Sequence, residues 1–312
     1  MSDSLSQPAG GLAPAGRPAT SAGSFTWVDA AMLLVVLIWG VNFAIIKVAL
    51  REIDPLAFAA LRFGLATAMM VGLALAFERS LRIQRGDFWK LLGLGLLGNG
   101  IYQILFMSGI ARTTAGNTSL ILATAPIFVA ILSAFMGYRL RPIAWAGILL
   151  SFTGLALIVF SGAGAQLGGD HVIGDVLVLS AAMCWGGYTA LLAPFLRRYS
   201  PLKLNALAML LGTPPLFLVA LPALTQQSWA TVTWQGWGGL MFAVVLSVVV
   251  AYIIWNTGVK RVGSARTAVY SNLVPVVALV TAAIVLGERI HPLQIAGAAV
   301  VVMGIVLTRR GR

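Results

Sequence analysis

The sequence has 312 residues, of which 59% are hydrophobic and 10% are charged. A soluble domain of this length cannot bury so large an apolar fraction in one core, so the composition excludes an ordinary water-soluble protein and predicts a membrane protein. The net charge of +12 would suit a nucleic-acid-binding protein, but the positions of the basic residues argue against that function, as shown below. The single cysteine, Cys184, excludes an intrachain disulfide and lacks the partners of a zinc site.

Residues 1–24 contain mostly Ser, Gly, Ala and Pro, so we expect a disordered cytoplasmic tail rather than a signal peptide. Ten apolar runs follow, each near the roughly 20 residues that a helix needs to cross about 30 Å of hydrocarbon. The expected spans are residues 27–50, 55–77, 88–110, 116–137, 143–161, 173–194, 204–223, 236–258, 267–287 and 292–308.

The basic residues are distributed unevenly over the loops between these spans. If the N-terminus lies in the cytoplasm, most of the 21 Lys and Arg residues fall in cytoplasmic segments, including Arg79, Arg82, Arg85 and Lys90. The positive-inside rule therefore predicts that both termini are cytoplasmic, with residues 309–312 as the cytoplasmic C-terminus. The basic charge then sets the topology, and we expect no nucleic-acid partner.

One stretch of sequence occurs twice. Residues 38–55 read "IWGVNFAIIKVALREIDP" and residues 184–201 read "CWGGYTALLAPFLRRYSP". The matching pairs are Trp39 and Trp185, Gly40 and Gly186, Ala44 and Ala190, Leu50 and Leu196, Arg51 and Arg197, and Pro55 and Pro201. With small shifts in register the similarity continues to Pro126 and Pro275, Gly147 and Gly297, and Gly154 and Gly304.

The repeat predicts two homologous bundles of five helices, over residues 27–161 and 173–308. Because five is odd, the second bundle must enter the membrane inverted relative to the first. We therefore expect an all-α membrane protein whose ten transmembrane helices form two inverted repeats around a central cavity, an architecture that supports alternating access.

Two segments carry a resemblance to a known family. "TAVYSNLVPVVALVTAAIVLGERIHPLQIAGAAVVVMGIVL", residues 267–307, is similar to the last two helices of the EamA family in the drug/metabolite transporter superfamily. Its first-half counterpart, residues 118–158, resembles them too, although Tyr138 stands where the second half has Glu288. The resemblance implies a cavity lined chiefly by the first, third, fourth, sixth, eighth and ninth spans, with the fifth and tenth at the periphery. It also implies a location in the bacterial inner membrane.

Polar and aromatic residues recur at helical spacing within several spans. Trp185 and Tyr188 share one face, as do Trp39 and Asn42. Such groups are costly in lipid, so we expect them to face the interior and to bind substrate, although the Trp-Gly pairs would also serve close helix packing. The expected substrate-binding residues are Trp185, Tyr102, Tyr188, Asn42, Gln103, Trp39, Asn99, Tyr252, Trp255 and Asn272.

Two prolines interrupt the fourth and ninth spans. Pro126 follows Thr124, and Pro275 follows Asn272. A proline frees a backbone carbonyl, so these positions are expected to form gating hinges or, as the simpler alternative, structural kinks.

The positions of the charged residues limit which transport mechanism and which solutes are expected. None of the nine Asp and Glu residues lies at the midpoint of an expected span, so the chain lacks the mid-membrane carboxylate of a proton-coupled drug carrier. This absence favours facilitated transport down the gradient of the substrate, with coupling by another route as the alternative. Lys47 and Arg62 are the basic residues nearest the membrane interior. We expect both to extend to the interface, with carboxylate binding as the alternative.

These patterns favour an inner-membrane secondary transporter that exports aromatic or other neutral amino acids and related metabolites. A multidrug or nucleotide- and phosphometabolite-type carrier is the alternative, and a channel is a further one. A membrane enzyme is disfavoured, because His171 and His291 lie in outer loops and no phosphate-binding loop occurs. We expect a small-molecule substrate and the lipid bilayer as partners, with no metal and no cofactor.

Overall fold

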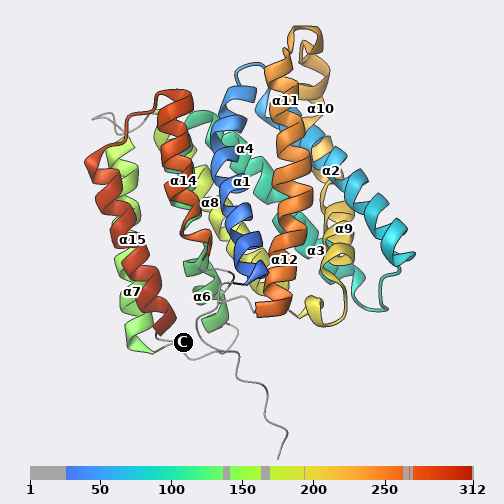
Figure 1. The fold of residues 1–312 in the computed structure, drawn as a ribbon, viewed down its shortest axis with the longest axis horizontal. Helices are drawn as coiled ribbons and strands as arrows, with labels where there is room; N and C mark the ends of the chain where they lie inside the picture. Colours follow the sequence, from blue (N-terminus) through green and yellow to red (C-terminus); the bar gives the residue numbers. More distant parts are fainter. Residues whose placement is uncertain are drawn as a thin grey trace, which may run out of the picture.

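The structure, a computed structural model, describes residues 26–135, 141–162, 169–192, 194–262, 267 and 270–310. Every regular element in these ranges is helical (Figure 1). The tail predicted over residues 1–24 lies outside the described residues, as do residues 311–312 of the predicted C-terminal segment.

The first half of the chain forms seven α-helices and one π-helical segment. They are α1 (Trp27–Ala49), α2 (Pro55–Glu78), α3 (Phe88–Gly95), the π-helix η1 (Leu96–Ile101), α4 (Tyr102–Arg112), α5 (Ala115–Leu122), α6 (Ala125–Phe135) and α7 (Pro142–Gly162). Because α3, η1 and α4 follow one another without a break, they form a single long helical stretch.

The second half repeats this plan. Its elements are α8 (Asp170–Leu192), the 3-10 turn η2 (Phe195–Arg197), α9 (Pro201–Gly212), α10 (Pro214–Gln226), the 3-10 turn η3 (Trp229–Thr231), α11 (Trp234–Phe242), the π-helix η4 (Ala243–Val250), α12 (Ala251–Val262), α14 (Val274–Thr281), the π-helix η5 (Ala282–Leu286) and α15 (Pro292–Arg310). The π-helices η1 and η4 lie at matching places in the two halves, each inside the third long helix of its half.

Each of the ten predicted spans corresponds to an apolar helix or helix pair. Among the described residues, six helical stretches are long and apolar enough to cross a membrane, and a bent pair makes a seventh. Three shorter apolar helices occupy the positions of the remaining spans. A multi-pass membrane protein is therefore supported, while ten crossings remain a prediction.

The fourth and ninth spans are broken near their prolines. Residues 123–124 separate α5 from α6, and a turn at residues 272–273 precedes α14. Pro126 and Pro275 lie in the first turn of the helix that follows each break, where the missing N–H removes no helical hydrogen bond. At each break a turn hydrogen bond replaces the α-helical pattern: the Thr124 N–H donates to the Ile121 carbonyl and the Leu273 N–H to the Tyr270 carbonyl, both at 3.0 Å.

The prediction of one continuous helix over residues 204–223 was wrong. Here α9 and α10 are bent by 52° at Thr213. The cause is the pair Pro214 and Pro215, which begins α10 and cannot continue the hydrogen bonding of α9. The predicted start was also late, because α9 begins at Pro201 after Ser200 caps it by accepting a hydrogen bond from the Lys203 N–H at 3.1 Å.

The outer surface of the bundle is apolar. Phe77, Leu218 and Ile284 are all more than 70% exposed, as expected for side chains that face lipid. Trp27, Trp89 and Trp234 are exposed near helix ends, in the positions that interfacial tryptophans occupy.

The helices α7 and α15 pack side by side at one edge of the bundle (Figure 1). A β-carbon at Gly147 would lie 2.5 Å from the Gly304 carbonyl oxygen, and one at Gly154 would lie 2.6 Å from the Gly297 carbonyl oxygen. Gly147 matches Gly297 in the repeat, and Gly154 matches Gly304, so the contact is reciprocal. Two copies related by a two-fold axis make contacts of this kind.

At each end of the bundle, a loop of one half contacts a helix of the other half, and the two loops match in the repeat. We call the end where α15 finishes the C-terminal end, and the opposite end, where Glu288 precedes α15, the Glu288 end. At the Glu288 end, the Glu52 carboxylate accepts hydrogen bonds from the Thr233 N–H and hydroxyl at 2.7 and 2.8 Å. Glu52 follows α1, and Thr233 caps α11.

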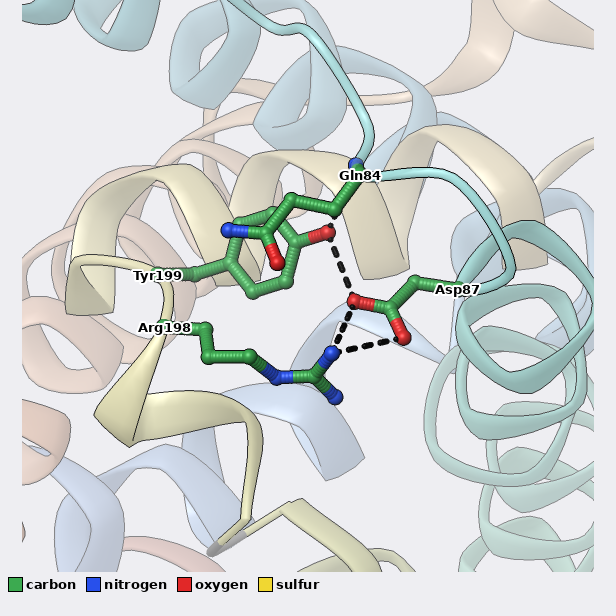
Figure 2. Close-up of polar contacts among 4 residues, drawn as sticks. All are labelled: Gln84, Asp87, Arg198 and Tyr199. Atoms are coloured by element: carbon green, nitrogen blue, oxygen red, sulfur yellow. Dashed lines mark hydrogen bonds and ion pairs between the residues drawn. The ribbon is translucent and has the colours of Figure 1, made fainter.

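The corresponding tie at the C-terminal end uses an ion pair. Arg198, which matches Glu52 in the repeat, lies 2.8 Å from a carboxylate oxygen of Asp87 at the start of α3. Tyr199 donates to the same carboxylate, and the Gln84 N–H donates to the Tyr199 hydroxyl, both at 3.0 Å (Figure 2). The loop after the first helix of each half therefore holds the third helix of the other half.

Candidate transport cavity

A cavity of about 350 Å³ lies between the two halves. It falls in the size range of small-molecule sites, about 300–1,000 Å³. Seven of the ten predicted binding residues line it: Trp39, Asn42, Tyr102, Gln103, Trp185, Tyr252 and Trp255. The predicted hinges Pro126 and Pro275 line it as well.

Two elements contribute to the wall that the family resemblance did not imply. Arg62 comes from α2, and Ile305 and Thr308 come from α15. The tenth span is therefore peripheral along much of its length but reaches the cavity near its end.

Aromatic rings form one side of the cavity. Trp39 and Trp185, which match in the repeat, meet edge to face with ring centroids 6.5 Å apart. Trp185 also lies 5.2 Å from Tyr102 and 5.8 Å from Tyr252, and Trp39 lies 5.0 Å from Trp255. These distances lie within the range in which aromatic pairs attract one another. The cluster draws on α1, α4, α8 and α12, so it joins both halves.

The π-helix η4 supplies polar anchors for this wall. The Trp39 indole N–H donates to the Ser247 carbonyl at 2.9 Å. A π-helix displaces carbonyls from the normal helical pattern, and such segments occur often at functional sites.

Arg62 is buried in the cavity wall, and the expectation that it extends to the interface was wrong. Its side chain is 5% exposed. Nη2 donates to the Ser247 hydroxyl at 3.1 Å, and Nε lies 3.4 Å from the Ala243 carbonyl. Arg62 lies seven residues after the start of α2, which is about 10 Å along the helix axis. At this depth its side chain hydrogen-bonds to acceptors of η4 instead of extending to the interface.

The other basic residue, Lys47, is bound within the protein at the Glu288 end. Its ammonium group donates to the carbonyls of Ile110 and Thr113 at 3.0 and 2.8 Å. These carbonyls belong to the C-terminal turn of α4 and the residue after it, where a cation is favourable.

Three predicted binding residues do not line the cavity. Tyr188 is buried in a neighbouring apolar cluster, where Gly98 leaves room for its ring, and it stacks on Trp185 at 5.4 Å. Asn99 is buried within η1, and Asn272 lies in the turn before α14. Tyr188 therefore supports a cavity residue from behind.

A polar network closes the Glu288 end of the bundle. Glu288 accepts hydrogen bonds from the N–H groups of Ala115 and Gly116 at 2.9 and 3.1 Å, which belong to the first turn of α5. A carboxylate is stabilised at a helix N-terminus, because the unpaired N–H groups point towards it.

Further hydrogen bonds at this end join α5 to two more helices, α8 and α15. Asp175 of α8 accepts from the hydroxyl of Thr113 at 2.5 Å and from the amide of Asn117 at 3.3 Å. Asn117 in turn accepts from Gln294 of α15 at 2.6 Å. The repeat partner of Glu288, Tyr138, lies outside the described residues.

Sequence reasoning missed Ser247 and misjudged Arg62. A serine in an apolar run carries little signal by itself. Arg62 is a single charge in the second span, which indicates either an interfacial or a buried functional residue. The contact that decides between them comes from η4, more than 180 residues away.

A bundle of apolar helices around a buried cavity with polar and aromatic walls defines a membrane transport protein. The sequence model of the EamA-like transporter family matches the chain twice, over residues 26–160 and 172–310. The chain belongs to this family.

Relatives with similar sequences extend along nearly the whole chain. One, from Escherichia coli strain K12, is named a probable amino-acid metabolite efflux pump and is 32% identical over 286 residues, which cover 88% of this chain and 92% of that protein. Another, from Streptantibioticus cattleyicolor, is named a probable terminal-alkyne amino-acid exporter and is 31% identical over 283 residues, covering 90% and 92%. A solved crystal structure at 21% identity matches with a TM-score of 0.66 over 93% of this chain and 98% of its own, which shows the shared fold.

Proposed function

We propose that the protein is a secondary transporter that exports neutral amino acids, aromatic ones among them, across the bacterial inner membrane. Both termini would lie in the cytoplasm, and net transport would follow the gradient of the substrate. The observation that carries this proposal is the cavity between the halves, which combines an aromatic cluster with Asn42, Gln103 and Arg62. Family membership and the names of the two relatives support it.

We propose alternating access as the mechanism. The reciprocal contact of α7 with α15 and the matching ties at the two ends support an inverted pair of repeats. The network around Glu288 is then the closed outer gate. The helical breaks before Pro126 and Pro275 lie next to the cavity, so we propose that they act as hinges.

The composition of the wall argues against two other carriers of the same superfamily. A phosphometabolite would need several cations, but Arg62 is the one Lys or Arg among the described residues that line the cavity. A cationic drug would favour a carboxylate in the wall, and the described lining contains no Asp or Glu.

The test is exchange of radiolabelled L-phenylalanine and L-leucine in liposomes that contain the purified protein. We expect saturable exchange that the other neutral amino acids inhibit and cationic drugs do not. Trp185→Ala should lower the apparent affinity about tenfold, because one aromatic contact is worth about 1 kcal/mol or more. Trp145→Ala is the matched control, since Trp145 is exposed on α7 away from the cavity.

Flux that rises linearly with concentration would favour a channel. Saturable flux that the drugs inhibit and the amino acids do not would replace the proposed substrate class with cations. An unchanged affinity in Trp185→Ala would remove the aromatic cluster from the binding site.

A further inference from the structure

Arg62 carries a buried positive charge and has no counter-ion among the residues that the structure describes. The one ion pair formed within the described part of the chain joins Arg198 to Asp87, far from the cavity. The acceptors that bind Arg62 are a hydroxyl and a carbonyl, which are both neutral. Its remaining terminal nitrogen, Nη1, is buried and has no hydrogen-bond partner.

An unpaired guanidinium is unusual in a buried position. Arginine stays protonated in proteins, so it cannot lose its charge as a buried lysine can. Removing the charge from water is costly unless an anion restores the lost interactions. The described lining of the cavity holds no Asp or Glu, so a solute with an anionic group would supply the missing interaction.

The cavity also holds two unpaired acceptors. Asn42 and Gln103 are 5% and 1% exposed, and the side-chain oxygen of each lacks a hydrogen-bond donor. Both residues line the same cavity as Arg62. Amide oxygens accept hydrogen bonds from an ammonium group without needing a negative charge of their own.

We propose that the site recognises the zwitterion of an α-amino acid: Arg62 binds the carboxylate through Nη1, and the amide oxygens of Asn42 and Gln103 bind the ammonium group. The apolar side chain then packs against the aromatic cluster around Trp185. This inference rests on the proposed function and adds to it the groups that the solute must carry. A solute lacking either charged group leaves a buried polar group of the protein unpaired.

The experiment compares ligands that differ by one group. Phenylalanine, leucine and valine, their amides and their N-acetyl derivatives compete for labelled L-phenylalanine on the purified protein. We expect each free amino acid to bind at least about tenfold more tightly than its amide or its N-acetyl derivative, because hydrogen bonds to charged groups contribute about 1.5–3 kcal/mol.

Variants assign each preference to a residue. Arg62→Gln should abolish the preference for acid over amide and keep the preference for a free amino group. Asn42→Leu combined with Gln103→Leu should have the opposite pattern. Arg62→Lys retains the charge without the planar geometry and should retain part of the acid preference, which keeps the test valid if Arg62→Gln folds poorly. Arg51→Gln, which removes an exposed arginine at the end of α1, is the matched control and should change neither ratio.

The two proposals fail in different ways. If amino acids bind and are transported but the acid-to-amide ratio is the same in the wild type, Arg62→Gln and Arg62→Lys, the recognition proposal is overturned and the transport proposal stands. If no neutral amino acid binds or is transported, the proposed function fails, and this inference fails with it.

Discussion

The two halves of the chain share the glycines that pack α7 against α15 and the tryptophans of the aromatic cluster, but the charged and amide residues of the described cavity lining occur in the first half alone. The agreement is clearest at Gly147 and Gly297, Gly154 and Gly304, and Trp39 and Trp185. The halves differ at other repeat positions: Asn42 corresponds to Tyr188, and Gln103 corresponds to Tyr252. Arg62 corresponds to Ala208, since both lie seven residues after the matching prolines Pro55 and Pro201. Among the described lining residues, the charge and the amides come from the first half, whereas both halves supply aromatic rings.

This division explains how an inverted repeat can bind an asymmetric solute. Symmetric positions give two similar gates, which alternating access requires. A cavity with the same groups on both sides would bind a symmetric molecule best. Because the charge and the amides of the described lining come from one half, the polar groups are distributed unevenly around the cavity, which suits an asymmetric solute. The comparison predicts that mutations at the matching glycines between α7 and α15 affect folding, whereas mutations at the differing cavity positions affect selectivity.

The largest effect is expected at a matching glycine. Gly147→Val places a side chain against the backbone of α15, 2.5 Å from the Gly304 carbonyl and the Thr308 nitrogen, and backbone cannot move aside easily. We expect a loss of about 3 kcal/mol in stability, measured as a lower melting temperature and lower yield of folded protein in detergent. Gly72→Val is the control, because a β-carbon there meets no atom within 4 Å. Equal loss in both variants would show that helix propensity, and not the crossing of α7 with α15, is responsible.

The matching tryptophans should separate folding from binding. Trp39→Phe removes the hydrogen bond to Ser247 and should cost about 1 kcal/mol of stability. Trp185→Phe should leave the melting temperature nearly unchanged and weaken substrate binding severalfold, because the smaller ring keeps only part of the contact with Tyr102 and Tyr252. The opposite assignment, with Trp185→Phe unstable and Trp39→Phe impaired in binding alone, would contradict the account.

The gates differ as well, since Glu288 corresponds to Tyr138. Glu288→Gln weakens the charge at the start of α5, which is worth about 0.5–1 kcal/mol. We expect a membrane-impermeant thiol reagent, applied from the Glu288 end, to modify Ser119→Cys about threefold faster in this variant. The background is Cys184→Ser, which removes the native thiol.

Ser119 lines the cavity, so its modification reports entry from that end. Asp170→Asn, an exposed carboxylate at the same end, serves as the control and should have no effect. An unchanged rate in Glu288→Gln would mean that Glu288 does not hold the gate.

The smallest effect concerns one hydrogen bond between matching residues. The hydroxyls of Thr67 and Thr213 lie 3.0 Å apart between α2 and the start of α10, and both residues are buried. Thr67→Val and Thr213→Val should each cost about 0.5 kcal/mol, and the double variant should cost less than the sum of the two. Strict additivity of the measured unfolding free energies would show that the two hydroxyls do not interact across the repeat.

The sequence was sufficient to predict the helices and much of the cavity wall. Helical spacing placed Trp39 beside Asn42, and the cost of polar groups in lipid directed both inward, where the structure places them. The spacing of residues along a helix does not show how deeply a helix face is buried or which residues of other helices pack against it. Tyr188 shares a face with Trp185, yet Gly98 on η1 provides space for its ring outside the cavity. Arg62 required knowledge of a contact with η4 that no local pattern contains.

A structure of the protein with bound L-phenylalanine would test the central claim most directly. The account predicts a carboxylate oxygen about 2.8 Å from Nη1 of Arg62, the ammonium group within hydrogen-bond distance of Asn42 or Gln103, and the phenyl ring against Trp185. A ligand in the reverse orientation, with its ring against Arg62, or one bound outside the cavity would contradict it.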